Sequence, residues 1–432
     1  MAVSHRTRQL RVSSLARVEG EGGLRVVIDG DRVDEIELQI YEPPRFFEAC
    51  LRGRQYTEVL DITARICGIC PVAYQTSGSN AIEDACGISV DGRIAALRRL
   101  LYCGEWISSH VLHIYLLHAV DFLGYQDAIA LAQDHRAEVE RGLALKKVGN
   151  AVLEAVGGRA IHPVNPRLGG FHRAPTPQEL AVLAEQLRRG LDLALETVTW
   201  VAGFDIPDVE IDHELVALTH PDRYAIEDGT VATASGLRIA PREYLQHAVE
   251  HQVPHSTALH ATFDGRRYLT GPLARYSINS AQLSPLAREA AAAAGLGETC
   301  RNPFRSIVVR AVETVYAIDE ALRIISSYER PDPPAAPVPP RAGVGHGVSE
   351  APRGLLYHRY QLEADGAIRT ATIMPPTSQN QPAIEDDLRR VVASNLQLDD
   401  EHLTGLCEQT IRNYDPCISC STHFLDMTIE RR

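Results

Sequence analysis

The sequence lacks several features that would place it in other large classes of proteins. Among its 432 residues no apolar run reaches the 18 or more needed for a membrane span, and residues 1–10 are polar, without the apolar core of a signal peptide. Basic side chains form no run and the formal net charge is −13, which argues against a nucleic-acid partner. We therefore expect a cytoplasmic protein with no direct membrane span and no nucleic acid bound.

The cysteine content also argues against a complete disulfide framework. The chain has nine cysteines, an odd number, and its 45% hydrophobic content is enough to bury a sizeable core without covalent staples. The sequence thus predicts reduced thiols and metal ligation. No internal repeat of fixed period is present.

Residue patterns predict a mainly α protein with a small N-terminal antiparallel β region, an α+β class. Two β-type runs, residues 24–28 and 33–40, are separated by glycine-rich turn signals. Asp91 is the expected N-cap of a long helix that continues toward Phe122. The other helices that we predict cover residues 138–156, 177–201, 242–253, 284–294, 304–328 and 384–392.

Two proline and glycine signals subdivide the C-terminal part. The run P-D-P-P-A-A-P-V-P-P at residues 331–340 excludes helix and central strand, and the turn Asp365-Gly366 between two β-type runs predicts a hairpin. The glycines of G-V-G-H-G do not indicate a dinucleotide loop, because they are not placed between a strand and a helix. We predict one domain over residues 1–432, with a β region at 1–45, a helical core at 46–330, a linker at 331–350, a hairpin and metal-binding segment at 351–423, and a tail at 424–432.

Two C-x-x-C motifs carry the chemistry. Cys67 and Cys70 lie in R-I-C-G-I-C, and Cys417 and Cys420 lie in D-P-C-I-S-C-S-T-H, near opposite ends of the chain. That separation is unlike a zinc ribbon, whose pairs lie within about 15–20 residues. Either pair alone is equally compatible with ordinary buried cysteines, but together they predict four thiolates on a soft transition metal. The other five cysteines and the three histidines of the long helix are interpreted as packing residues.

These motifs give the chain a resemblance to the large subunit of nickel-iron hydrogenases. The resemblance extends from A-R-V-E-G at residues 16–20 through R-I-C-G-I-C, N-P-R-L-G-G-F and E-A-P-R-G to D-P-C-x-x-C-x-x-H. It implies that family's fold, with a central helix bundle, and nickel bound by all four thiolates. Cys67 and Cys417 would bind nickel alone, and Cys70 and Cys420 would bridge to an iron that carries carbon monoxide and cyanide.

The resemblance also assigns roles around the cysteines. Glu19 matches the glutamate that takes the proton from the Cys417 sulfur. Arg353 matches an arginine over the metals, Asp415 the aspartate that pairs with it, and Thr377 a hydroxyl that bonds one cyanide. A magnesium site is implied as well. Its ligands would be Glu48, His423 and the main-chain carbonyl near Ile373, of which the two oxygens suit a hard cation best.

The implied activity is the reversible heterolytic cleavage of dihydrogen. The chain has no further cysteine set for an iron-sulfur cluster and no nucleotide fold, so an iron-sulfur small subunit and diaphorase subunits are implied partners. Tyr74 and Ser109 replace residues of the respiratory members, and with G-E-W-I-S-S-H they resemble the cytoplasmic NAD(P)-linked branch. Two alternatives are a hydrogen-sensing regulatory subunit and a non-catalytic subunit of a quinone-reducing complex, whose members lack the four thiols.

The nine residues after His423 have no place in the implied site. Family members lose such a tail to a maturation endopeptidase once chaperones have inserted nickel. Burial of the charged end Glu430, Arg431 and Arg432 would be costly. We therefore predict a mature chain that ends at His423, with an ordinary frayed terminus as the alternative.

Overall fold

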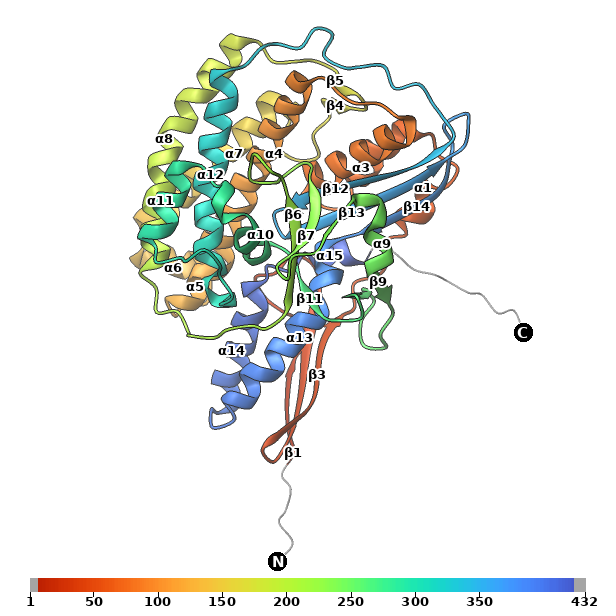
Figure 1. The fold of residues 1–432 in the computed structure, drawn as a ribbon. Coiled ribbons are helices and arrows are strands. Elements are labelled where there is room, and N and C mark those ends of the chain that lie inside the picture. The colour runs from red at the N-terminus through yellow and green to blue at the C-terminus, as the bar shows by residue number, and fades with distance from the viewer. Residues whose placement is uncertain (1–6, 423–432) are drawn as a thin grey trace, which may run out of the picture.

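The computed structural model describes residues 7–422 and has an α+β fold, as predicted. The long helices gather on one side of the molecule, and a curved sheet covered by α3 (Pro71–Cys86) lies on the other (Figure 1). His423 and the tail at 424–432 lie outside the described residues, so the predictions made for them are not addressed by the structure. Among residues 7–422, no helix combines the length and apolar character that a bilayer crossing requires.

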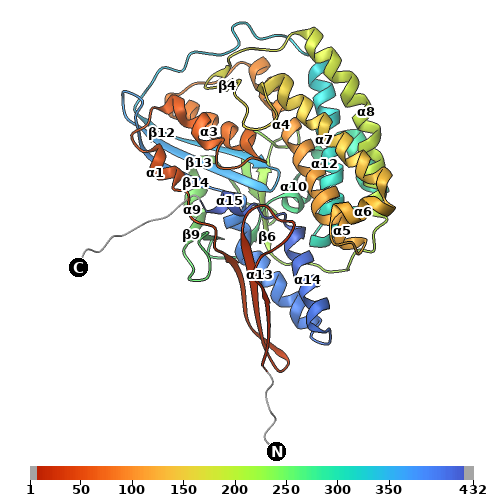
Figure 2. The same ribbon diagram turned by 180° about the vertical axis from the view of Figure 1, so that it is seen from behind.

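The N-terminal strands form a three-stranded antiparallel sheet. β1 (Thr7–Val12), β2 (Gly22–Asp29) and β3 (Arg32–Ile40) are neighbours in that order, and they project from the body beside helix α13 (Pro376–Ser394; Figure 2). From Leu24 to Asp29 of β2, buried residues alternate with less buried ones, as a strand with one face on a core requires. The two predicted runs are thus confirmed. β1 was missed because only Leu10 of its six residues is buried.

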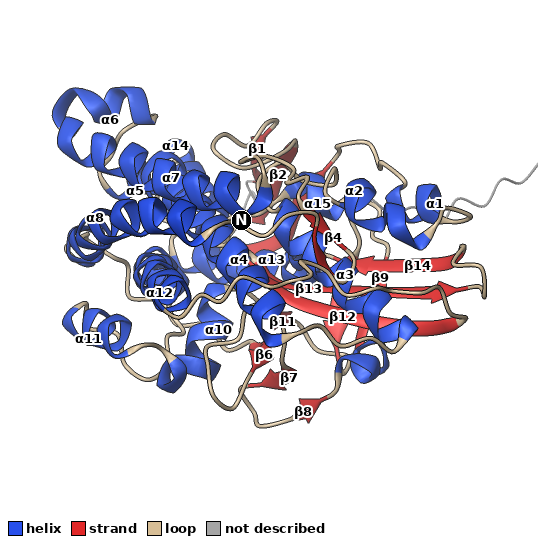
Figure 3. Ribbon diagram, turned by 90° about the horizontal axis from the view of Figure 1, so that it is seen from above, coloured by secondary structure: helices blue, strands red, loops and turns tan. Residues whose placement is uncertain are grey.

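Four long helices make the predicted bundle. They are α4 (Gly92–Leu112), α7 (Arg136–Gly157), α8 (Pro177–Ala202) and α12 (Ser306–Ser326), and they lie side by side at the left of Figure 3. The Asp91 side chain accepts the Arg93 N–H, which confirms the predicted N-cap. A Cβ on Gly104 would lie 2.8 Å from the Cβ of Val152, so glycine allows α4 and α7 to pack closely.

The predicted long helix continues from α4 through a π-helical turn, His113–His118, into α5 (Ala119–Phe122). A ring nitrogen of His113 lies 2.7 Å from the Arg412 carbonyl oxygen, and one of His118 lies 2.9 Å from Asn413 Oδ1. Both partners are at the end of α14 (Asp400–Asn413). The bundle therefore supports the segment that leads into the second cysteine pair.

The predicted hairpin is part of a three-stranded antiparallel sheet. β13 (Gly354–Leu362) and β14 (Ile368–Met374) are the two expected strands, and β12 (Gly343–Ala351) pairs with β13. The predicted linker at 331–350 was therefore wrong beyond residue 342, although the proline run forms neither helix nor strand. The glycines of β12 have a packing reason, since a Cβ on Gly345 would lie 1.9 Å from the Ala81 oxygen of α3.

The middle of the chain contains more strand than the sequence indicated. The helix predicted at 242–253 is only a 3-10 turn and α9 (Tyr244–His247), after which the chain becomes strand β9. β9 gains its ladder from β10, the next strand along the chain, and the periodicity of residues 242–253 does not reveal this pairing. The strands of the two small sheets in this region are β6 (Glu214–Thr219), β7 (Thr230–Thr233), β8 (Arg238–Ile239), β11 (Tyr268–Leu269), β9 (Ala248–His251) and β10 (His260–Phe263).

The last predicted helix is longer than expected and is followed by others. α13 includes Pro382 and covers more than the predicted residues 384–392, and α14 was not predicted. The remaining helices are α1 (Phe47–Leu51), α2 (Val59–Thr63), α6 (Ala128–Asp134), α10 (Pro272–Asn279), α11 (Pro285–Ala293) and α15 (Ile418–Ser421), and β4 (Pro166–Arg167) pairs with β5 (Gly170–Phe171).

Candidate metal centre

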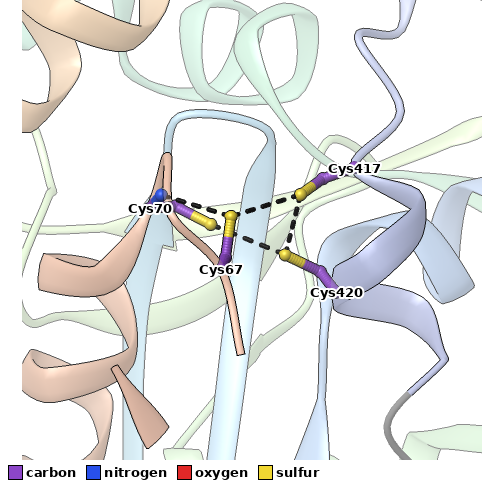
Figure 4. Close-up of side chains that lie close together, drawn as sticks. All are labelled: Cys67, Cys70, Cys417 and Cys420. Atoms are coloured by element: carbon purple, nitrogen blue, oxygen red, sulfur yellow. Dashed lines mark hydrogen bonds between the residues drawn. The ribbon is translucent and has the colours of Figure 1, made fainter. Parts of the chain in front are cut away.

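The four cysteines of the two C-x-x-C motifs meet in the interior. Cys67 and Cys70 lie just before α3, Cys417 and Cys420 lie at α15, and all four sulfurs point toward one another (Figure 4). The Sγ–Sγ distances are 3.4 Å for Cys67–Cys417, 3.6 Å for Cys70–Cys420 and 2.8 Å for Cys417–Cys420. Thiolates at about 2.3 Å from one tetrahedral metal are about 3.8 Å apart. The Cys67–Cys417 and Cys70–Cys420 distances are close to this spacing, whereas the Cys417 and Cys420 sulfurs would have to move apart by about 1 Å.

The electrostatics of the cluster also fit a bound cation. Burial raises the pKa of the Cys417 and Cys420 thiols, whereas hydrogen bonds with the other cysteines hold the pKa of Cys67 well below its usual range. One thiol therefore ionises readily while further negative charge is opposed in the buried site. A cation would compensate for that charge and favour the thiolate forms. Four soft donors in one buried place fit nickel and iron.

Neighbouring segments fix the sulfur positions. The N–H groups of Ile69 and Cys70 lie 3.3 and 3.4 Å from the Cys67 sulfur. The Cys417 N–H donates to Thr377 Oγ1 at 2.9 Å, which connects the second pair to the first turn of α13. Thr377 thus lies beside the cluster, and its bond to a cyanide ligand stays a prediction.

Arg353 and Asp415 are both buried and paired beside the cysteines. Arg353 Nε donates to the Asp415 carbonyl oxygen at 2.9 Å, and Nη2 lies 3.0 Å from Asp415 Oδ1. Asp415 has a left-handed φ of 49°, which turns the chain from α14 into the cysteine segment. The Arg353 charge acts on Cys67 and lowers the pKa of that thiol, after the stronger effects of the other cysteines.

Glu19 is in direct contact with a cysteine sulfur. Its Oε2 accepts from Cys417 Sγ and from the Ser419 N–H, both at 3.1 Å. The Ile418 N–H donates to the Glu19 carbonyl at 2.9 Å, so the N-terminal segment is bonded to the cysteine segment. Burial, followed by the charge of Cys67, raises the pKa of the Glu19 carboxyl. The arrangement provides a proton acceptor within hydrogen-bond distance of a sulfur of the four-cysteine cluster.

The residues expected to hold magnesium are partly brought together. Glu48 Oε1 accepts the Ile373 N–H at 2.5 Å, so the carboxylate lies beside the expected main-chain position. A second carboxyl, Glu250, is close enough for the Glu48 charge to act on it. Burial is the main cause that raises the Glu250 pKa to about 8. Ser378 Oγ donates a hydrogen bond to Glu250 Oε1 at 2.9 Å. Sequence reasoning missed Glu250, because it lies in the segment wrongly predicted to be helical.

Another missed residue supports the first cysteine pair. Glu105 of α4 accepts the N–H groups of Val72 at 2.6 Å and Ala73 at 3.1 Å, in the first turn of α3. Burial raises the Glu105 pKa well above its usual range. Its position in G-E-W-I-S-S-H, inside an otherwise buried helix, was an available signal. Tyr74 and Ser109, the noted departures, are both buried.

Comparison with known proteins defines the class to which this fold and site belong. Residues 45–165 and 242–423 match the nickel-dependent hydrogenase family, and the chain belongs to it as a large subunit of the nickel-iron type. It is 35% identical over 419 residues to sulfhydrogenase 1 subunit alpha of Pyrococcus furiosus, which covers 96% of this chain and 97% of the relative. It is 27% identical to the NAD-reducing hydrogenase HoxS subunit beta of Cupriavidus necator, over 97% of this chain and 95% of the relative.

Solved structures show the same fold. An NAD+-reducing [NiFe]-hydrogenase in the H2-reduced state superposes with a TM-score of 0.84 at 25% identity, covering 96% of this chain and 99% of that one. The Ni-Fe-Se hydrogenase of D. vulgaris Hildenborough superposes with a TM-score of 0.80 at 22% identity, over 97% and 100% of the two chains. The recognition of the family from its motifs is therefore confirmed.

Proposed function

We propose that this hydrogenase large subunit catalyses the reversible heterolytic cleavage of dihydrogen and passes the electrons toward NAD(P). The observation that carries the proposal is the buried group of four cysteines, one of which is bonded to a carboxyl. Cys67 and Cys417 would hold nickel alone, and Cys70 and Cys420 would hold it together with an iron that carries carbon monoxide and cyanide. The bound metals would supply the Lewis acid that dihydrogen cleavage needs.

Glu19 would hold and move the proton. Dihydrogen has no group that side chains can grip, so the base must already lie at the site where the proton is released. The 3.1 Å contact between Cys417 Sγ and Glu19 Oε2 supports this role. The raised pKa of Glu19 also supports it, because a carboxyl with a raised pKa both accepts and releases a proton near neutral pH more readily than an ordinary glutamate.

Arg353, Asp415 and Thr377 would orient what binds in the centre. The Asp415 contacts hold the Arg353 guanidinium in one position, where its charge favours thiolate forms. Thr377 accepts the Cys417 N–H, which leaves its own O–H available as a donor to a cyanide ligand.

We also propose magnesium as a third metal, held by Glu48, the Ile373 carbonyl and His423. The two carboxyls Glu48 and Glu250 support a nearby cation, since Glu250 is buried and the neighbouring Glu48 charge makes a second negative charge there still more costly without one. We further propose that the mature chain ends at His423. A maturation endopeptidase would remove residues 424–432 after chaperones have inserted nickel. Residues 1–432 are proposed to form one domain.

The proposed partners are an iron-sulfur small subunit and a diaphorase module in the cytoplasm. The likeness to the NAD-reducing hydrogenase subunit of C. necator supports the pyridine-nucleotide link. A hydrogen-sensing subunit is the second candidate, because it would share this centre. The intact thiol set argues against a non-catalytic subunit of a quinone-reducing complex.

The test is metal analysis of the purified complex with a cysteine variant. Serine is a harder and far less acidic ligand than cysteine. Cys417→Ser should therefore lose both its nickel and its activity in isotope exchange between dihydrogen and deuterated water. Cys407→Ser is the matched control, since Cys407 is buried on α14 outside the cluster and should retain both. Full nickel occupancy in Cys417→Ser would refute the four-thiolate site. Infrared bands of carbon monoxide and cyanide in the wild-type complex test the iron ligands.

A further inference from the structure

We propose a second transition-metal site in this chain, formed by His255, His260 and Glu385 and suited to a divalent cation such as Zn²⁺ or Ni²⁺. The candidate ligand atoms of these three side chains all lie within 4.8 Å of one another. The site uses none of the residues assigned to the nickel-iron or magnesium centres. Two imidazoles and a carboxylate are the donors that zinc and its neighbours in the first row prefer.

The backbone brings these ligands together from two directions. β9 and β10 form an antiparallel pair in which His251 is opposite His260, and His255 lies in the loop between the strands. Glu385 lies on α13, which packs against β10. The histidines form the run H-x3-H-x4-H, a signal that remained unnoticed because the segment around His251 was predicted to be helical.

The side chains are already arranged much as a metal would require. His255 Nε2 lies 2.8 Å from Glu385 Oε1, and the same oxygen accepts the Leu38 N–H at 2.9 Å, which fixes the carboxylate. Nitrogen and oxygen ligands on one tetrahedral Zn²⁺ are about 3.4 Å apart, so closure around the ion needs side-chain movements of about 1–1.5 Å. Binding would use the Nε2 lone pair of His255, so in the tautomer protonated at Nε2 that proton would move to Nδ1 or to solvent.

His260 supplies an independent indication of a ligand. Its side chain is buried, with only 4% of the residue exposed, and Nε2 has no partner of hydrogen-bond geometry among residues 7–422, although the Gln381 amide lies beside the ring. A buried polar nitrogen without a partner is costly unless something coordinates it. A metal ion would satisfy this atom.

The site is accessible, and its charged neighbours are otherwise engaged. A cavity of about 210 Å³ reaches His251, His260 and Glu385. Two arginines line it, but Arg267 is paired with Asp386, and Arg389 donates to the Val33 carbonyl at 2.7 Å. The ring centroids of His251 and His260 are 6.0 Å apart, and His251 is not one of the three proposed ligands. Water would complete the coordination of the metal.

A metal here would hold the β9–β10 hairpin onto α13, close to the cysteine segment. In the same loop, the Thr257 N–H donates to the Ile40 carbonyl at 2.8 Å, and Ala258 packs with Ile40 and Ile418. Ile418 lies between the second pair of cysteines. The site would therefore be structural: the metal would stabilise the loop between β9 and β10, which packs against the segment that carries Cys417 and Cys420.

The experiment is a Co²⁺ titration of the assembled holoenzyme, in which the cysteine centre is already filled. We expect one equivalent to bind with visible d–d absorption and without the near-ultraviolet bands of cobalt–thiolate bonds. His260→Ala and Glu385→Gln should each weaken this binding at least about tenfold, since even outer-sphere changes at metal sites cost about 10–100-fold.

His247→Ala is the matched control. His247 Nδ1 lies 2.8 Å from Asp264 Oδ1 at the base of the same hairpin, and in the part of the chain that the structure describes this pair has no third ligand. The control should bind Co²⁺ as the wild type does. Absence of thiolate-free Co²⁺ binding in the wild type would overturn the proposal, as would unchanged binding in both Glu385→Gln and a folded His260→Ala. Circular dichroism establishes folding, and the near-isosteric Glu385→Gln decides the matter if His260→Ala does not fold.

Discussion

The sharpest prediction concerns Glu19→Gln. Glutamine has nearly the same shape, and its side-chain oxygen can still accept the Ser419 N–H that now lies 3.1 Å from Oε2. What is lost is the base: an amide oxygen in that position can still accept a hydrogen bond from the Cys417 thiol, but it cannot take up the proton. One hydrogen bond is worth only about 0.5–1.5 kcal/mol net, so the variant should fold and retain nickel. A positioned acid-base group contributes about 10²–10⁴-fold to rate, so we expect turnover to fall by about 10²-fold or more.

The assay is the rate of isotope exchange between dihydrogen and deuterated water per nickel atom, measured together with the rate of dye reduction by hydrogen. Glu21→Gln is the matched control, because Glu21 is exposed two residues away in the same segment, and its activity should stay within about twofold of wild type. Undiminished exchange in Glu19→Gln at full nickel occupancy would refute the assigned proton route. Loss of nickel would instead show that Glu19 is needed to build the centre.

The same variant has a pH signature in stability. Burial raises the Glu19 pKa, so the folded chain binds this proton more tightly than the unfolded chain. The resulting stabilisation is fully present below the unfolded pKa and is lost as pH rises through the folded pKa. Glutamine does not titrate, so the stability of wild type relative to Glu19→Gln should decline as pH rises across that interval. Urea unfolding of metal-free chains at several pH values measures this difference, and a pH-independent difference would contradict it.

Three further outcomes are expected. Arg353→Lys keeps the charge but loses the two-point contact with Asp415, so nickel should remain while hydrogen uptake falls about 10²–10³-fold; unchanged uptake would remove Arg353 from the chemistry. Thr377→Val leaves the buried Cys417 N–H without its acceptor and should lower the free energy of unfolding by about 1–3 kcal/mol in urea titrations, whereas Thr377→Ser should restore it; equal stability of the two would show that the contact is dispensable. Intact-mass measurement of nickel-containing protein should find a chain that ends at His423, and an active chain that retains the tail would favour the sensor alternative.

The meeting of the four cysteines could be predicted from the sequence because two C-x-x-C motifs in one chain are a rare pattern. Two C-x-x-C motifs signal their chemistry through spacing alone, and the structure places Cys67 and Cys417 together. Asp91 was equally predictable as an N-cap, since capping is decided within one helical turn. Features with local causes were thus within reach.

Features that depend on contacts with other elements were not. The segment from Arg242 to Val253 has helical spacing, but its residues 248–251 become strand because the following strand β10 pairs with them. Glu105 and Glu250 are single carboxyls whose importance comes from burial next to other elements, and burial has no local signature at one position. The same reason hides His260, which is ordinary in sequence and acquires a meaning only beside Glu385.

The meeting of the two cysteine pairs orders events during biosynthesis. Cys67 and Cys417 are 350 residues apart, so a ribosome that has made the first pair still has most of the chain to add before the second exists. A metal therefore cannot be bound by all four cysteines until translation is nearly complete, and until then only the first cysteine pair, Cys67 and Cys70, is available. Once metal joins the pairs, it closes a loop of 350 residues. The chain-entropy relation for cross-links gives about 6 kcal/mol for a loop of that length. Metal binding would then be a late step that cross-links the folded chain and stabilises it against unfolding.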